Sequence, residues 1–314
     1  MPKKLNVALL VHTATAWGFQ LLEGVARYAK KQDQWKILHE PGHGAHEVLR
    51  LSEEWKVDGI LTQLHDPHTA AHVTDRGAPI VNMSSSSFER SEVIPRVCED
   101  VAGMGIMAAD HFADLGFKNF AYYGSFRHNF YTSLRDAFEE SVKQKRGTFS
   151  CHPHLEQRQG ARKRNRDKIG LKEWLASLPK PVGIFAWKSR SATELGEACH
   201  ELGILIPEQV AILIVGASRN PINEILDPPV SNVVVDATEI GYRAALLLDQ
   251  LMQQKDPGTA PVPVDPILVP PVGIDIRTST DTLAIGNEHV AKAVAFIREH
   301  ALEPITVADV HYLS

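Results

Sequence analysis

Apolar and polar positions along the chain fall into two alternating patterns. Short runs of Val, Ile and Leu, such as residues 7–11 and 211–215, are continuous rather than alternating, which is typical of strands covered on both faces of a sheet. Between these runs, apolar residues recur every three or four positions, as Phe19, Leu22 and Val25 do, and so form a buried helical stripe. The alternation predicts a parallel α/β architecture almost from end to end.

The expected strands and helices follow from these patterns. The predicted strands are Val7–Val11, Lys36–His39, Gly59–Gln63, Pro79–Met83, Asn119–Tyr123, Gly183–Trp187, Ala211–Val215 and Asn232–Val235. The predicted helices are Gly18–Lys31, Glu47–Trp55, Val101–Leu115, Phe130–Lys143, Leu171–Leu178, Ala192–Leu202 and Glu239–Met252. Gly116 and Gly203 follow two of these helices, at a position where glycine commonly ends a helix.

Composition narrows the class of protein. The 314 residues are 44% hydrophobic, which is enough for two compact units with cores of their own. The three cysteines are widely spaced and odd in number, which fits a reducing cytosol and no disulfide framework. The N-terminal apolar run is too short for a signal or membrane segment. We therefore expect a cytoplasmic protein with no membrane partner.

The net charge of −5 argues against a nucleic-acid groove within these residues, because phosphate binding needs a basic patch. The one basic stretch, Arg158–Lys168, is interpreted as a solvated loop, with an anion or partner contact as the less favoured alternative. Two histidine clusters have spacings that zinc sites use, but no cysteine or carboxylate completes either set; the histidines are His39, His43, His46, His68 and His72. The motifs of hydrolases and nucleotide-binding proteins are missing too. We predict no metal, no cofactor and no catalytic residues, and an enzyme is the disfavoured alternative.

Three segments in order carry recognisable motifs: Asp100–Gly124, Glu201–Ile212, and Asp227–Val233 with Gly241–Ala245 after it. Together they resemble the LacI/periplasmic-binding-protein-like sensor fold. The segment Ala293–Val310 resembles the first helix of an AraC-type DNA-binding domain, and this domain order is similar to xylose-operon-type transcription regulators. The resemblance implies two Rossmann-like lobes hinged by crossing strands, a small effector in the cleft, usually a sugar, and a homodimer.

The resemblance also sets the expected boundaries. They are a sensing domain at 1–276 (lobe one about 1–99 and 237–253, lobe two about 100–236 and 266–276), a linker at 277–286, and the truncated start of an AraC-type helix-turn-helix domain at 287–314. Residues 287–301 should form an amphipathic helix with an exposed apolar face. DNA binding by the 314 residues should be weak and non-specific at best, because the recognition helix of such a domain falls outside them.

Relatives in this family bind sugar hydroxyls with charged side chains at four places. The corresponding residues here, all uncharged, are Phe19, Leu134, Ser189 and Ser218. The sugar-type pocket is therefore expected to be substantially altered, because each buried hydroxyl left without a partner costs about 1–3 kcal/mol. Either the pocket has turned to a different ligand, flat or anionic, or sensing is lost and the lobes serve as a dimerisation module. The residues expected at the ligand cleft are Trp17, Phe19, Leu134, Trp187, Ser189, Ser218 and Arg219.

Overall fold

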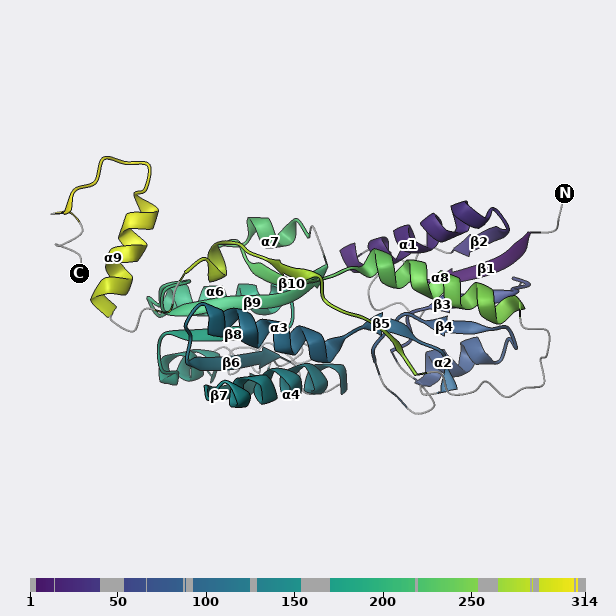
Figure 1. Ribbon diagram of the computed structural model, residues 1–314, viewed down its shortest axis with the longest axis horizontal. Helices are drawn as coiled ribbons and strands as arrows, with labels where there is room; N and C mark the ends of the chain where they lie inside the picture. Colours follow the sequence, from purple (N-terminus) through teal and green to yellow (C-terminus); the bar gives the residue numbers. More distant parts are fainter. Residues whose placement is uncertain are drawn as a thin grey trace. The chain divides into compact units, whose positions relative to one another are not determined.

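The chain forms two α/β units, each built on its own sheet (Figure 1). Unit one comprises residues 1–101, 128–130 and 235–272, and unit two comprises 102–127, 131–234 and 273–314. This computed structural model describes residues 4–13, 15–39, 54–65, 67–86, 88, 93–124, 129–153, 170–217, 220–253, 265–282, 284, 288–307 and 309. The predicted α/β architecture with two lobes is confirmed.

Unit one contains a parallel sheet with the strand order β2-β1-β3-β4. The strands are β1 (Leu5–Leu10), β2 (Trp35–His39), β3 (Gly59–Thr62) and β4 (Ile80–Asn82). The helices are α1 (Ala16–Gln32), α2 (Pro67–Thr74) and α8 (Ala237–Gln253). Helix α2 packs on one face of the sheet, where Ala70 and Val73 meet Ala8 and Ile60, and α1 and α8 lie together on the other (Figure 1).

Helices α1 and α8 approach so closely that glycine is required on both. A Cβ atom on Gly24 would lie 2.0 Å from the carbonyl oxygen of Thr238, and one on Gly241 would lie 2.2 Å from that of Leu21. Such distances are far inside van der Waals contact, so any side chain would force the two helices apart. This backbone contact joins the N-terminal helix to one that follows it by more than two hundred residues.

Unit two contains a six-stranded sheet with the order β12-β10-β9-β8-β6-β7. Its strands are β6 (Asn119–Gly124), β7 (Thr148–Pro153), β8 (Val182–Ala186), β9 (Val210–Ala217), β10 (Ser231–Val235) and β12 (Gly273–Asp275). Its helices are α3 (Val101–Asp114), α4 (Asn129–Gln144), α6 (Ser189–Glu201) and α7 (Ile222–Ile225), with the short helix η2 (Thr278–Thr280) and a helical stretch at 170–177. Strands β7, β6, β8 and β9 are parallel, and β12 runs antiparallel to β10.

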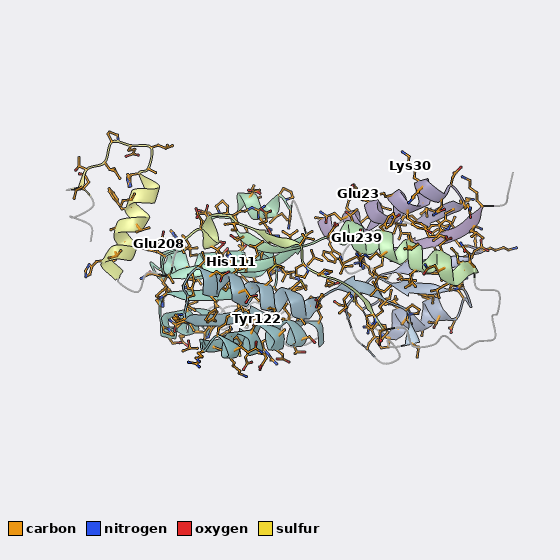
Figure 2. All side chains as sticks on the ribbon, viewed as in Figure 1. Glu23, Lys30, His111, Tyr122, Glu208 and Glu239 are labelled. Atoms are coloured by element: carbon orange, nitrogen blue, oxygen red, sulfur yellow. The ribbon has the colours of Figure 1, made fainter. Side chains whose placement is uncertain are left out.

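The two faces of this sheet have different cores. Aliphatic side chains of α6 and of residues 170–177 pack on one face, around Leu175, Ile184 and Leu195. The other face is aromatic, because Phe112 of α3 and Phe138 of α4 lie edge-on against each other and against Phe120 of β6. Tyr122 of β6 is completely buried in this second core (Figure 2).

The segment 266–276 differs from the expectation that it forms one strand of lobe two. Strand β11 (Ile267–Val269) pairs in parallel with β5 (Val97–Glu99) and belongs to unit one, whereas β12 pairs with β10 in unit two. The physical reason is Pro270-Pro271, because two consecutive prolines lack the N–H groups that a continuous ladder needs.

Two other helices that the sequence predicts have different outcomes. The amphipathic helix near residues 287–301 is confirmed as α9 (Glu288–Glu299), and its apolar residues Val290 and Ile297 are exposed. Most of the expected helix Glu47–Trp55 lies outside the described residues, as does the basic stretch at 158–168. No helix among the described residues is long and apolar enough to cross a membrane.

Replacing Gly24 by Ala should destabilise unit one by about 1–3 kcal/mol, because the new methyl group would overlap the backbone of α8. The matched control is Gly196→Ala in α6, where the added Cβ would find only an ordinary contact of 3.4 Å with Asp227. That change should stabilise slightly, by roughly 0.5–1 kcal/mol. Thermal unfolding of both variants checks the difference in sign, and equal effects would contradict the close helix contact.

Candidate ligand site

The polar side chains of unit two gather where its parallel strands end. Strands β6, β8 and β9 run in the same direction, so their carboxyl ends share one edge of the sheet. Trp187 and Ser189 follow β8 directly, and Asn220 lies three residues after β9. Ligands of open α/β sheets bind beyond this edge, and we therefore take it as the candidate ligand site.

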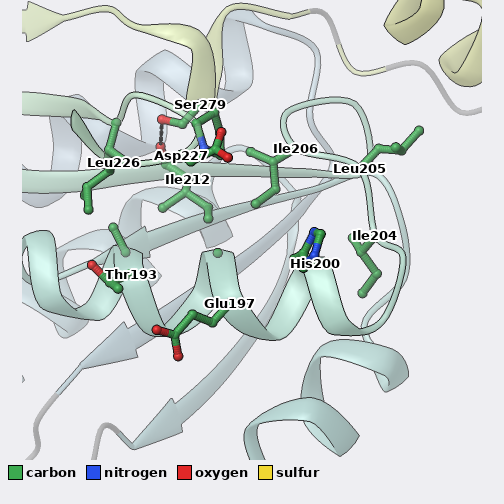
Figure 3. A pocket seen from close by; sticks show the side chains of 14 residues that line it. Thr193, Glu197, His200, Ile204, Leu205, Ile206, Ile212, Leu226, Asp227 and Ser279 are labelled. Carbon is green, nitrogen blue, oxygen red and sulfur yellow. Dashed lines mark hydrogen bonds between the residues drawn. The ribbon is translucent and has the colours of Figure 1, made fainter. Parts of the chain in front are cut away.

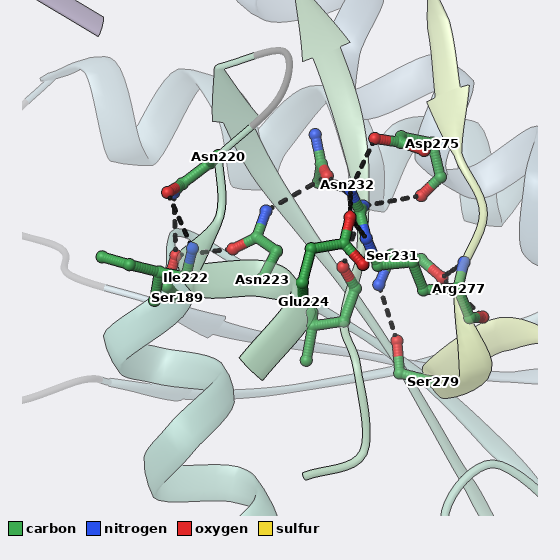
Figure 4. A network of polar contacts seen from close by, with 11 residues as sticks. Ser189, Asn220, Ile222, Asn223, Glu224, Ser231, Asn232, Asp275, Arg277 and Ser279 are labelled. Carbon is green, nitrogen blue, oxygen red and sulfur yellow. Dashed lines mark hydrogen bonds and ion pairs between the residues drawn. The ribbon is translucent and has the colours of Figure 1, made fainter. Parts of the chain in front are cut away.

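Ser189 is the first residue of α6 and takes part in a run of hydrogen bonds (Figure 4). Its Oγ donates to Asn223 Oδ1 at 2.8 Å and accepts from Asn220 Nδ2 at 3.4 Å. Asn223 Nδ2 donates in turn to Asn232 Oδ1 at 3.1 Å. Asn223 and Asn232 are almost completely buried, and these bonds replace the water that the Asn223 amide and Asn232 Oδ1 lose on folding, whereas Asn232 Nδ2 is buried without a hydrogen-bond partner.

Arg277 contacts the far end of this series of hydrogen bonds, at Asn232. Its Nη1 donates to Asn232 Oδ1 at 2.9 Å, and its Nη2 donates to Glu224 and to Asp275, each at 2.7 Å (Figure 4). The hydrogen bond that Arg277 donates to Glu224 is the largest of the effects that raise the pKa of Arg277 above its ordinary value. The side chain of Arg277 is only 9% exposed, and its two carboxylate partners balance its buried charge.

The expected cleft residues of unit two fall in three different places. Trp187 is half-buried at the candidate site, with its ring edge-on to Tyr131 at 5.0 Å. The structure differs from the expectation at Leu134, which has no exposed surface and belongs to the core, because α4 turns this position toward the sheet. Ser218 and Arg219 lie outside the described residues.

The expected cleft residues of unit one both lie in the first turn of α1. Trp17 is half-buried. Phe19, which the apolar periodicity placed in the buried stripe of this helix, is instead 60% exposed, because the buried face is formed by Leu21, Val25 and Tyr28. The turn is held by Thr15, whose Oγ1 accepts from the backbone N–H of Gly18 at 3.0 Å. An exposed aromatic ring at this position keeps an apolar surface available for a ligand.

Unit one also has a polar carboxyl edge that the sequence reasoning missed. Gln63 Oε1 accepts from the backbone N–H of His12 at 3.2 Å, and Asn82 Oδ1 accepts from that of Leu64 at 2.9 Å. Among the described residues, Thr62 Oγ1 and Asn82 Nδ2 are buried without a hydrogen-bond partner. Because these residues are scattered over three strands, their only sequence signal was a polar residue at or after the end of a buried strand.

Two arginines of unit two form ion pairs, whereas Lys188, between Trp187 and Ser189, is exposed. Arg190 forms an ion pair with Glu194, which also accepts a hydrogen bond from Tyr123 at 2.8 Å. Arg135, which follows the expected cleft residue Leu134, forms an ion pair with Asp136. These contacts weaken the hypothesis of an anionic ligand.

A cavity of about 450 Å³ lies along α6 in unit two, away from the strand ends (Figure 3). Its lining is mostly apolar, with Ile204, Ile206 and Leu226, and it also includes Glu197 of α6 and Asp227, which lies next to Ser279. The neighbouring Ile225 is 80% exposed. The cavity therefore opens beside a further apolar surface.

Among the described residues, no three His, Cys, Asp or Glu side chains are placed to hold a metal ion. Cys98 and Cys199 are buried free thiols, and Cys151 is an exposed one. Of the two histidine clusters, His43 and His46 lie outside the described residues.

Residues 109–280 match the periplasmic binding protein-like domain, and residues 6–103 match the XylR N-terminal domain. Because the first match covers more than half of the 314 residues, the chain belongs to the periplasmic binding protein-like domain family. Within it, the chain is similar to regulators of xylose operons.

The xylose operon regulatory protein of Escherichia coli (strain K12) is 28% identical over 316 residues, which cover 98% of this chain and 78% of that protein. Its counterpart from Haemophilus influenzae is 27% identical, with 97% and 78% covered. The solved structure of the xylose-binding transcription activator xylR superposes with a TM-score of 0.81 at 26% identity, over 99% of this chain and 79% of that one. A LacI family regulator from Bifidobacterium animalis, with a TM-score of 0.66 and 19% identity over 89% and 98% of the two chains, shares the fold.

Burial raises the pKa of the Glu99 carboxyl above its ordinary value of 4.5, although Ser85 Oγ donates to Oε1 at 2.9 Å. Folding therefore favours the protonated form, and the fold loses stability as the pH rises above 4.5. This penalty is absent below about pH 4.5, the pKa of the unfolded chain, and complete above the native pKa.

Glu99→Gln should therefore raise the midpoint of thermal unfolding at pH 7.5, because the amide oxygen keeps the bond from Ser85 without the charge. At pH 4 the variant and the wild type should unfold together. Glu173→Gln, at an exposed position, is the matched control and should change neither midpoint. A lower midpoint for Glu99→Gln at pH 7.5 would contradict the role of burial.

Proposed function

We propose that this chain is the effector-sensing part of a xylose-operon-type transcription regulator, with a substantially altered sugar pocket and a small uncharged carbohydrate as its effector. The observation that carries the proposal is the run of uncharged hydrogen-bonding side chains, Ser189, Asn220 and Asn223, at the carboxyl edge of a sensor fold. The matches to xylose operon regulators support the regulatory role. A regulator of this kind works in the cytoplasm and is not an enzyme.

The altered pocket keeps the capacity to bind hydroxyl groups. Ser189 stands where relatives carry a carboxylate, and the neighbouring amides of Asn220 and Asn223 add donors and acceptors that the sequence reasoning did not count. The compensated charges of Arg190 and Arg135 leave less attraction for an anion. A rebuilt neutral pocket is therefore favoured over a flat anionic ligand and over loss of sensing.

Isothermal titration calorimetry with D-xylose, D-xylulose, xylitol and D-xylonate tests the proposal. At least one neutral compound should bind saturably with a dissociation constant below about 1 mM, which corresponds to ~4 kcal/mol. D-Xylonate, which differs from the others by its carboxylate, should bind more weakly. Binding of D-xylonate alone would favour the anionic ligand, and binding of none of the four would favour a module without sugar sensing.

We further propose that the partner protein is a second copy of this chain, seated on the cavity along α6. The cavity is lined mainly by apolar residues, and Ile225, next to Leu226 of its lining, is 80% exposed. Burying apolar surface of this kind in a protein interface stabilises the complex. The net charge of −5 argues against DNA as the partner of units one and two themselves.

Ile225→Glu should weaken the dimer at least about tenfold, because it places a charge in an apolar contact, while the fold is unaffected at so exposed a position. Leu302→Glu, at another exposed aliphatic residue, should leave the dimer unchanged. Sedimentation equilibrium measures both constants. A monomeric wild type, or equal dimer affinity in Ile225→Glu, would exclude this surface.

A further inference from the structure

We infer that residues 277–284 form a clamp, which fastens the predicted linker to unit two and so orients the helix α9 that follows. The inference goes beyond the proposed function, because it concerns how the chain leaves the sensor fold and not what the fold binds. Connecting segments normally run over the surface, where water satisfies their polar groups. Ser279 and Thr280 of η2 are instead almost completely buried, although both are polar.

Ser279 holds two strands of the sheet at once (Figure 4). Its Oγ donates to the backbone carbonyl of Ile212 in β9 at 2.6 Å and accepts from the backbone N–H of Ser231 in β10 at 2.9 Å. Its own N–H donates to the carbonyl of Pro229 at 3.0 Å. A hydroxyl group both donates and accepts, whereas an alanine here would leave a donor of one strand and an acceptor of the other without partners.

The hydroxyl group of Ser231 fastens the residues on either side of Ser279. Its Oγ accepts from the backbone N–H of Arg277 at 2.8 Å and donates to the carbonyl of the same residue at 3.0 Å. Thr280 Oγ1 donates to it as well, at 2.7 Å. Ser231 is completely buried, so these three hydroxyl groups are satisfied away from water.

The clamp is also held at its two ends. At the first, the guanidinium of Arg277 forms ion pairs with Glu224 and Asp275. At the last, the N–H of Ala284 donates at 2.9 Å to the carbonyl of Leu115, one of the carbonyls that the end of α3 leaves without a helical partner. Helix α9 begins at Glu288, so its start lies within about 14 Å of Ala284 even along a fully extended chain.

A rigid connection differs from a tether in what it transmits. A flexible linker absorbs a rotation of the body before it in its own backbone dihedral angles. A clamped linker passes that rotation on to the next element, as the packed elements of hinge and shear motions do. Through the clamp, unit two therefore sets the orientation of α9.

Hydrogen exchange in the full chain, without added ligand, tests the clamp. In the wild type, the amides of Ser279, Thr280 and Ala284 should exchange at least about a hundredfold more slowly than in an unstructured peptide. Ser279→Ala and Thr280→Val should each speed this exchange at least about fivefold, because buried hydrogen-bond partners are lost, while β6 and β8 stay protected. Thr278→Ala, at the exposed residue of η2, is the matched control and should exchange like the wild type.

A distance measurement tests whether the clamp orients α9. Spin labels are placed at Glu173→Cys in unit two and Lys292→Cys in α9, both exposed positions, in a Cys151→Ser background that removes the exposed native thiol. The distribution of distances between the labels should be broader in Ser279→Ala than in the wild type. Thr278→Ala should give the wild-type distribution.

Two results would overturn the inference. Exchange of the wild-type linker at the rate of an unstructured peptide, or equal exchange in Ser279→Ala and Thr278→Ala, would reject the clamp. An unchanged distance distribution in Ser279→Ala would reject its hold on α9. If Ser279→Ala does not fold, Thr280→Val, which keeps the shape of the side chain, decides both measurements. Neither measurement uses a ligand, so their failure leaves the proposed function standing, and a chain that binds no sugar leaves the clamp standing.

Discussion

The buried guanidinium of Arg277 is the constraint on which the candidate site depends. A charge that is 9% exposed persists only if its partners compensate it, and Glu224, Asp275 and Asn232 do so from α7, β12 and β10. Strand β12 is remote in the sequence from α7 and β10, so the charge fixes this end of the sheet in one arrangement. Through Asn232 and Asn223 the same arrangement reaches Ser189, where a ligand would be recognised.

Unit one is organised by a different constraint, the close approach of two helix backbones. Gly24 and Gly241 let α1 and α8 approach to a distance that no side chain would permit, and the contact seats both on the sheet. Steric fit therefore holds the helices of unit one in place. In unit two, a compensated charge holds together the elements at the end of the sheet. Both devices join segments that are remote in the chain, which makes each unit cooperative.

The uncharged site has a consequence for recognition. A carboxylate binds hydroxyls more strongly than a serine does, because charge-assisted hydrogen bonds are the stronger kind. A serine and an asparagine held in fixed orientations gain less per bond, but lose little entropy when the ligand arrives. Affinity in such a site depends on how rigidly the amides are held, and the buried Asn223 and Asn232 provide that rigidity.

The sequence by itself determined the layered α/β architecture, because continuous apolar runs and helical stripes are local patterns that leave few ways to bury both. All eight expected strands are present, as is the exposed apolar helix α9. Strands β5 and β7 were missed, and β11 and β12 were expected as one strand. Strands β5, β11 and β12 have only three residues each and owe their existence to a partner strand. Within the candidate site, the sequence predicted Trp187 and Ser189. Only the tertiary structure added Asn220, Asn223 and Arg277 and removed Leu134, because burial and hydrogen-bond partners are set by residues that are distant in the chain.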